Sequence, residues 1–224
     1  MEQNSPSDAS PDPLTSSGAP LPETVRFDPA SRSPGAWVFL IAVTLTALLI
    51  DLSTKHAAFR WVADAPVNVR ADEVLAAGPA RLDTLLPAHP PIVVIPHLLE
   101  FKLVLNAGAV FGAGQGKRYV FMGFTFLALG FALWMFARWT DRRERLAHGA
   151  IALLLAGGLG NLYDRVVYAC VRDFLHPLPT AKLPFGLAWP SGDRMLWPYV
   201  SNVADAFLIL GIAVLVVKLW KGDR

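Results

Sequence analysis

The chain has 224 residues, of which 54% are hydrophobic and 17% charged, and its formal net charge is +2. A mean hydropathy of +0.41 is too high for a water-soluble domain of this size, and the balanced charge argues against a nucleic-acid-binding protein. The only cysteine, Cys170, excludes a disulfide framework and a zinc site built on several thiolates. The histidines show no HExxH or other close pairing, which excludes a zinc hydrolase of that kind.

The first 33 residues are rich in proline and serine and contain almost no apolar run. Such a segment buries too little surface to offset its chain entropy, so we expect residues 1–33 to form a disordered tail. It lacks the basic start, apolar stretch and small-residue cleavage site of a signal peptide, so we expect no signal-peptide cleavage and the first hydrophobic segment to stay attached.

Four apolar, charge-poor runs follow, and each is close to the roughly 20 helical residues that cross a membrane. They predict spans at about 34–51, 118–137, 146–164 and 199–218. The predicted fold class is therefore an all-α membrane protein whose four transmembrane helices form one domain over residues 34–224.

Basic residues mark one side of these spans. They lie in the short connection between the second and third spans and after the fourth span: Arg138, Arg142, Arg143, Arg145, Lys218, Lys221 and Arg224. Basic residues near span ends in short loops favour the cytoplasm, so we expect both termini to be cytoplasmic. The longer connections, 52–117 and 164–198, then lie on the outer side.

The outer connections contain structure of their own. Residues 62–91 are typical of an irregular insertion, whereas Phe101, Leu103 and Leu105 alternate with other residues and predict an extended segment in a small outer platform. Residues 176–198 predict an ordered or membrane-skimming loop, with Trp189 and Trp197 at the headgroup level.

Polar side chains collect at the outer ends of the spans. Asp51 ends the first span, and the others lie at the end of the third span, at the start of the fourth and before the second: Asn161, Asp164, Arg165, Asn202, Asp205 and Asn106. Ionisable groups at such depth usually face the bundle interior or a wet cavity. Spacings of three or four residues place the members of each set on one helix face, so we expect a site where these faces converge.

Several of these residues have a simpler interpretation. Asp51 and Lys55 are consistent with an ion pair at the membrane interface, and Asp164 with Arg165 is consistent either with a helix end or with a structural clamp. Asp205, about two turns inside the fourth span and without a charged neighbour, favours a functional role.

Asp173 is either a solvated loop residue or the partner of Asp205. A carboxylate pair that performs acid–base chemistry needs one member kept protonated. Arg165 should keep Asp164 ionised, so Asp173 is the freer candidate.

Gly157, Gly158 and Gly160 predict close helix packing. Gly108 is typical of a backbone turn, and Cys170 of a packed thiol rather than a nucleophile.

Five motifs in this order carry a family resemblance: DLSTK at 51–55, NAGAVF at 106–111, GGLGNLYDRV at 157–166, VRDFL at 171–175 and SNVADAFLILG at 201–211. The chain resembles the lipoprotein signal peptidase, or signal peptidase II, family. The resemblance implies an aspartyl endopeptidase of the bacterial inner membrane. Such an enzyme removes the signal peptide from diacylglyceryl-modified prolipoproteins by cleaving just before the lipidated cysteine.

The resemblance also implies the site. Asp173 and Asp205 would be the catalytic pair at the periplasmic side, supported by Asp51, Lys55, Asn106, Gly108, Asn161, Asp164, Arg165 and Asn202. An outer β-cradle and a helix-bearing lid loop are expected, with no metal or cofactor. The expected partners are the prolipoprotein substrates and membrane lipid, and we expect a monomer. Ser201 stands where the family often has Phe, and the insertions at 62–91 and 176–198 are longer than the core requires.

Other classes remain open from the residues alone. A small carrier would use Asp205 and Arg165 as a proton or ion relay, although no inverted repeat is evident. A scaffold would use the polar faces only for packing. A serine or metallo protease is disfavoured because the chain has neither GxSxG nor HExxH.

Overall fold

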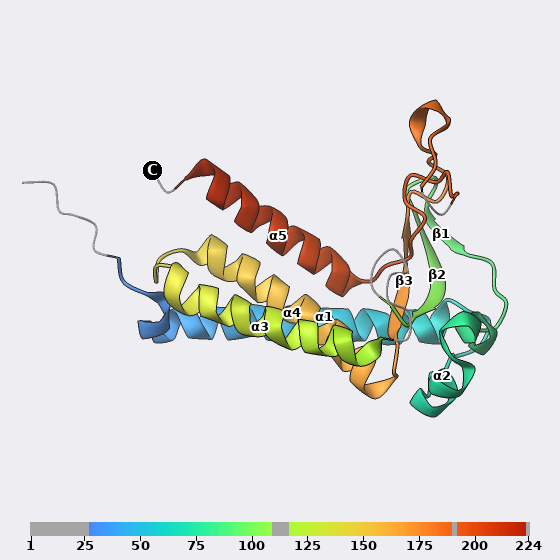
Figure 1. Cartoon of the computed structure of the whole chain (residues 1–224), viewed down its shortest axis with the longest axis horizontal. Helices are drawn as coiled ribbons and strands as arrows, with labels where there is room; N and C mark the ends of the chain where they lie inside the picture. Colours follow the sequence, from blue (N-terminus) through green and yellow to red (C-terminus); the bar gives the residue numbers. More distant parts are fainter. Residues whose placement is uncertain (1–26, 109–116, 190–191, 223–224) are drawn as a thin grey trace, which may run out of the picture.

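The computed structural model describes residues 27–108, 117–189 and 192–222 (Figure 1). Four helices are long and apolar enough to cross a membrane: α1 (Pro34–Trp61), α3 (Arg118–Trp139), α4 (Arg145–Val167) and α5 (Val203–Lys221). Three strands form one antiparallel sheet in the order β1 (Ile92–Ile95), β2 (Leu99–Asn106) and β3 (Val171–Pro177). The short helices within these ranges are η1 (Ala30–Arg32), α2 (Ala71–Ala77), η2 (Pro79–Leu85) and η4 (Pro184–Gly186).

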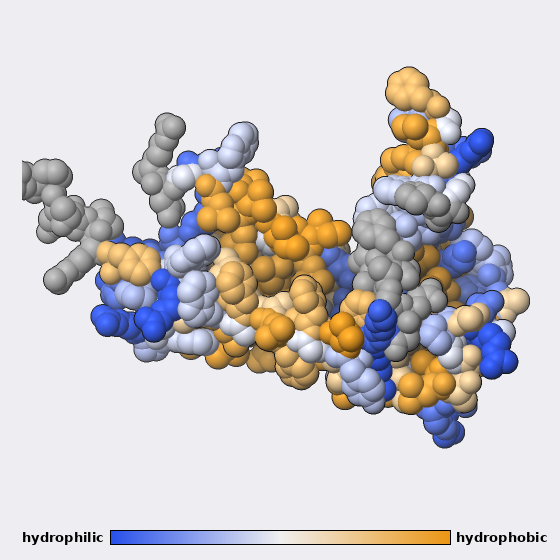
Figure 2. Space-filling model, viewed as in Figure 1, coloured by the Kyte–Doolittle hydropathy of each residue, from blue (hydrophilic) through white to orange (hydrophobic). Residues whose placement is uncertain are grey.

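The long helices and the sheet occupy separate parts of the molecule. Helices α1, α3 and α4 run side by side, and the sheet lies at one end of them, here called the sheet end (Figure 1). Hydrophobic residues cover the helices, and hydrophilic residues gather towards the two ends (Figure 2). Large apolar side chains such as Phe124 and Leu127 are exposed along α3, as expected where a helix faces lipid rather than water. The protein is thus a multi-pass membrane protein, and the predicted fold class is confirmed.

Two helix boundaries differ from the predicted spans by four residues or more. Helix α1 starts at Pro34, after the N-cap Ser33, but continues beyond residue 51 to Trp61. The helix continues past Asp51, whose side chain is fully buried. Helix α5 starts at Val203 instead of 199 because the backbone of Ser201 pairs with Leu175 of β3. This pairing uses main-chain groups, so serine in place of phenylalanine at 201 is compatible with it.

The predicted tail is too long at its C-terminal end. Ala30 is fully buried, and its amide donates to the carbonyl of Thr140 at 2.9 Å, while Asp28 forms an ion pair with Arg142 at 3.0 Å. Residues 27–33 therefore pack against the α3–α4 connection; residues 1–26 lie outside the described residues. The end of α5 meets the same connection through an ion pair between Lys218 and Glu144.

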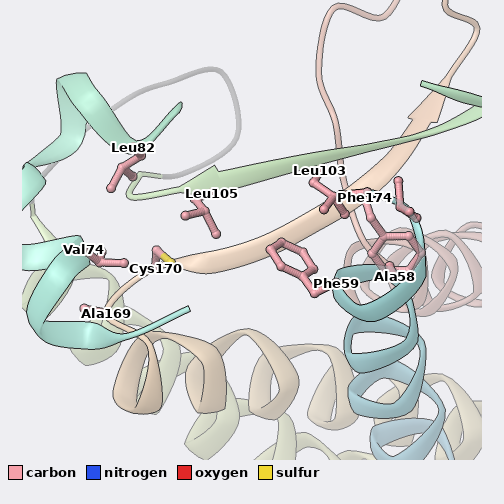
Figure 3. Close-up of a cluster of buried hydrophobic side chains, with 11 residues drawn as sticks. Ala58, Phe59, Val74, Leu82, Leu103, Leu105, Ala169, Cys170 and Phe174 are labelled. Carbon is pink, nitrogen blue, oxygen red and sulfur yellow. The ribbon is translucent and has the colours of Figure 1, made fainter. Parts of the chain in front are cut away.

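The sheet buries one face against the insertion. Leu103 and Leu105 of β2 and Phe174 of β3 join Phe59 of α1 and Val74 of α2 in one apolar cluster (Figure 3). Cys170 lies in the same cluster with no exposed surface, and burial raises the pKa of its thiol to about 12. The prediction of an inert, packed thiol is confirmed.

The other face of the sheet carries Asp173. Residues alternate between the faces of a strand, and Asp173 pairs with Val104 while its neighbours Arg172 and Phe174 point to the opposite side. Strand β3 lies where the sequence pattern predicts a loop. Helix α2 packs on the face away from Asp173, so it is not the expected lid; residues 109–116, after β2, lie outside the described residues.

The loop after β3 is ordered over its described residues. Leu183 donates to the carbonyl of Arg194 at 2.8 Å, which makes a hairpin that projects from the sheet end (Figure 1). Phe185 near its tip is 98% exposed. Contact of this hairpin with the membrane surface remains a prediction.

Glycines allow helices α4 and α5 to lie close together. A Cβ on Gly157 would lie 2.5 Å from the carbonyl oxygen of Ala204, and one on Gly211 would lie 2.8 Å from that of Ala150. Helices α4 and α5 are therefore in backbone contact along their length, as predicted for small residues in a membrane. This contact brings the start of α5 to the polar end of α4.

Candidate active site

Every predicted site residue lies at the sheet end, where α1, α4 and α5 meet β2 and β3. Helix α1 contributes Asp51 and Lys55, and β3 contributes Asp173. The remaining residues come from α4, from the end of β2 and from the start of α5: Asn161, Asp164, Arg165, Asn106, Gly108, Asn202 and Asp205. Hydrogen bonds and ion pairs join them into one network.

Asp205 is held by the first turn of α5. Asn202 is the N-cap; its side chain accepts from the Asp205 amide at 3.1 Å, and the Asp205 carboxylate accepts from the Asn202 amide at 3.2 Å. This reciprocal capping box provides hydrogen-bond partners for backbone amides in the first turn, which have none within the helix. The expectation that Asp205 lies two turns inside the helix was wrong, because α5 starts later than the apolar run. The N-x-x-D spacing is the signal that would have revealed the cap.

Asp173 is enclosed by the sheet and by α5. Its side chain is almost fully buried, and it accepts hydrogen bonds from Asn202 Nδ2 at 2.6 Å and from Asn106 Nδ2 at 3.1 Å. Burial, followed by the negative charge of Asp205, raises the pKa of Asp173 to about 8. Asp173 therefore carries a proton at neutral pH, whereas Asp205 is only half-buried.

Two asparagines connect the two carboxyl groups. Asn161 Nδ2 donates to Asp205 Oδ1 at 2.8 Å, and Asn202 Nδ2 donates both to Asp173 and to Asn161 Oδ1, the latter at 3.1 Å. Lys55 Nζ donates to the same Asn161 oxygen at 3.0 Å. An ammonium group can only donate, so Lys55 requires Asn161 to present its oxygen there and its amide nitrogen to Asp205.

A buried ion cluster supports this arrangement. Lys55 Nζ lies 2.9 Å from Asp51 Oδ2 and 3.5 Å from Asp164 Oδ2, and all three side chains have no exposed surface. Asp164 also binds the guanidinium of Arg172 at 2.8 Å. The ion-pair partners of Asp164 are thus Lys55 and Arg172, and Arg165 forms no ion pair with it among the described residues. Arg172 was not among the predicted site residues, and its only signal in the sequence is its place next to Asp173.

Asp51 connects α1 to α5. Its Oδ1 accepts from the Ala204 amide at 2.8 Å, and a Cβ on Gly160 would lie only 2.2 Å from its Oδ2. The Asp51–Lys55 pair is therefore a buried ion pair and not one exposed on the surface of α1. It lies between three helices, and Gly160 provides the space for it.

Arg165 acts as a clamp on the end of β2. It donates to the Gly108 carbonyl at 3.1 Å and to the Asn161 carbonyl at 3.3 Å, and the Gly108 amide donates to Asn106 Oδ1 at 2.9 Å. These bonds fix the turn that follows Asn106. Of the alternatives for Arg165, the structure favours the clamp.

Within residues 27–108, 117–189 and 192–222, no group of three or more His, Cys, Asp or Glu side chains is placed to hold a metal ion. Fold and site together define an integral membrane protein in which two carboxyl groups share an asparagine network at one end of a four-helix bundle.

Comparison with known proteins identifies the family. A family model described as Signal peptidase (SPase) II matches residues 43–221. A lipoprotein signal peptidase of Ectopseudomonas mendocina is 32% identical over 137 residues, which cover 59% of this chain and 73% of the relative. One from Halothermothrix orenii is 29% identical over 133 residues, covering 59% and 78%. A bacterial membrane enzyme solved by the in meso method has a TM-score of 0.56 and 25% identity, covering 81% of this chain and 87% of that one.

The chain belongs to the signal peptidase II family. It is a peptidase of the class that removes signal peptides from prolipoproteins.

Proposed function

We propose that the chain is an aspartyl endopeptidase that cleaves diacylglyceryl-modified prolipoproteins just before the lipidated cysteine, with Asp173 and Asp205 as its catalytic pair. The observation that carries the proposal is the hydrogen-bonded bridge of Asn161 and Asn202 between two carboxyl groups with unequal burial. A carrier or scaffold does not require two carboxyls held in this way.

The unequal burial supports different roles for the two carboxyl groups. Asp205, half-buried and ionised, takes a proton from a water molecule, which attacks the scissile carbonyl carbon. Asp173, protonated, donates its proton to the carbonyl oxygen. The proton taken up by Asp205 then passes to the leaving amine as the peptide bond breaks, and Asp173 recovers its proton from the collapsing intermediate. Asn106 and Arg165 hold the turn at Gly108 beside Asp173, and we expect this fixed turn to support the substrate backbone.

The position of the pair supports a lipid-modified substrate. The network lies where the apolar helices give way to the polar sheet end (Figures 1 and 2). Acyl chains on the substrate can remain in the hydrocarbon while the neighbouring peptide bond reaches the carboxyls. We place the sheet end on the outer face of the bacterial inner membrane, with both termini in the cytoplasm and a monomer as the working unit. Arg138, Arg142 and Arg143 lie at the opposite end, consistent with that orientation.

The substrate is tested with the full chain in detergent and two prolipoprotein substrates that differ only in the diacylglyceryl group. We expect cleavage of the modified substrate immediately before its cysteine, with kcat/KM at least about 100-fold above that for the unmodified form, because remote binding energy positions the scissile bond. Mass spectrometry of the products locates the bond. Equal cleavage of both substrates would contradict the role of the lipid.

The pH dependence follows from the pKa of Asp173. Asp173 must be protonated to donate, and its pKa is raised to about 8, so kcat/KM should fall as the pH rises through about 8. Because the pair must carry a single proton, the rate should also fall at acidic pH as the pair takes up a second proton. The check is a pH profile of initial rates in a detergent in which the enzyme remains folded throughout. A rate that keeps rising beyond pH 9 would assign Asp173 to the base instead.

A further inference from the structure

A second polar cavity lies at the sheet end, away from the carboxyl pair. It has a volume of about 210 Å³ and lies between the last turns of α1, the loop at 66–69 and the junction of α4 with β3. Its polar lining consists of His56, Arg60, Asn68, Tyr168 and Arg172. The cavity is separate from the proposed catalytic pair, because Arg172 and Asp173 are neighbours on a strand and point to opposite faces.

The lining is rich in donors and free of carboxylates. Arg172 binds Asp164 through Nε and Nη2 and lies over the ring of Tyr168, with its guanidinium carbon 4.2 Å from the ring centre. That leaves its Nη1 without a hydrogen bond among the described residues. Arg60 is exposed and forms no ion pair within the part of the chain that the structure describes. The wall therefore presents the uncompensated charge of Arg60 beside the free Nη1 of Arg172, and both favour an anion.

The cavity is at the depth of lipid headgroups. Helix α1 has 28 residues, which span about 42 Å at about 1.5 Å per residue, whereas the hydrocarbon core is about 30 Å thick. With the start of α1 at one membrane surface, the last eight or so residues project beyond the hydrocarbon at the other. His56 and Arg60 fall in this projecting part. The backbone bond from the Val67 amide to the Phe59 carbonyl, 2.8 Å long, holds the loop of the insertion beside them.

We propose that this cavity binds the phosphate group of a phospholipid headgroup. Guanidinium groups bind phosphate through several parallel hydrogen bonds, and Arg60 and Arg172 approach the same space from α1 and β3. His56, Asn68 and Tyr168 supply further donors. The site rests on the wall of the cavity and not on the proposed peptidase chemistry.

The experiment uses the full chain in detergent and measures lipid binding by native mass spectrometry. The probes are phosphatidylglycerol and a diacylglycerol with the same acyl chains but no phosphate. The pocket variant is His56→Gln with Arg60→Gln, which leaves Arg172 and its ion pair intact. The control is Arg81→Gln, an exposed arginine on η2 outside the cavity. We expect the pocket variant to bind phosphatidylglycerol at least about tenfold more weakly, the loss of about one charge-assisted hydrogen bond. The control variant and diacylglycerol binding should not change.

A second measurement identifies the source of the phosphate. Inorganic phosphate is added to the lipid-free chain, and the melting temperature is recorded for the same three proteins. A rise that the pocket variant loses, with unchanged lipid binding, supports the phosphate site but assigns it to a free anion. Equal phosphatidylglycerol binding by all three proteins together with no pocket-dependent phosphate effect overturns the proposal. Cleavage of prolipoprotein by the pocket variant, which retains the carboxyl pair, reports separately on the proposed function.

Discussion

Asp173→Asn and Asp205→Asn are each expected to lower kcat for prolipoprotein cleavage by at least about 10³-fold, within the range that general acid–base groups contribute. The double variant should be no slower than the slower single variant, because two carboxyls that share one proton act as a unit. Initial rates on the lipid-modified substrate measure both effects. Asp83→Asn, an exposed acid on η2, is the matched control and should retain full activity.

The stability of Asp173→Asn separates a catalytic role from a structural one. The folded-state pKa of Asp173 is raised to about 8, above an unfolded value of about 3.9. The folded chain therefore binds the extra proton between these values, and the contribution of Asp173 to stability falls as the pH rises from about 4 to about 8. Asparagine does not ionise, so the variant avoids this loss of stability at high pH. Above pH 8 it should therefore have a higher melting temperature than the parent while being inactive. A variant that is inactive because it is unfolded, or one that retains cleavage, would contradict the assignment.

Lys55→Met should have the largest effect on stability. The substitution keeps the length of the side chain but leaves Asp51 and Asp164 without the ammonium that lies between them. Breaking a buried ion pair by removing one partner costs about 3–5 kcal/mol. Cleavage should fall as well, because Asn161 loses the donor that sets its amide orientation. Thermal unfolding in detergent measures the first effect, and rates at a temperature where the variant is folded measure the second.

A double variant tests the reason for this loss. Asp51→Asn with Lys55→Met removes both charges of the 2.9 Å pair, so it should be more stable than Lys55→Met alone by at least about 1 kcal/mol. Lys102→Met, an exposed lysine on β2, is the control and should change stability by less than about 0.5 kcal/mol. If Lys55→Met were as mild as Lys102→Met, the buried cluster would not be what holds α1 to α4.

The sequence by itself determined the class of fold and the members of the polar network except Arg172. Uninterrupted apolar runs define membrane helices because a span needs about 20 such residues, and charged residues at their ends are costly unless they face a site. For that reason Asp51, Asn161 and Asp205 are recognisable as candidate site residues from their positions along the chain. The alternation around Leu103 and Leu105 likewise predicted an extended segment, which is β2.

Only the tertiary structure decided how these residues are paired. Local spacing suggested that Arg165 neutralises Asp164, whereas the fold brings Arg172 and Lys55 to that carboxylate and sends Arg165 to the Gly108 carbonyl. Apolar content also placed the start of α5 too early, because hydropathy does not register the backbone pairing of Ser201 with β3.

The environment of Asp173 depends on the same long-range packing. Its burial comes from strand β3, from α5 and from the asparagines at 106 and 202, which lie far from it in the chain. A sequence pattern shows which side chains are polar and how they are spaced along one helix or strand. The pKa of a carboxyl and the choice of its partner depend on which other elements enclose it, and that is fixed only when the helices and the sheet pack together.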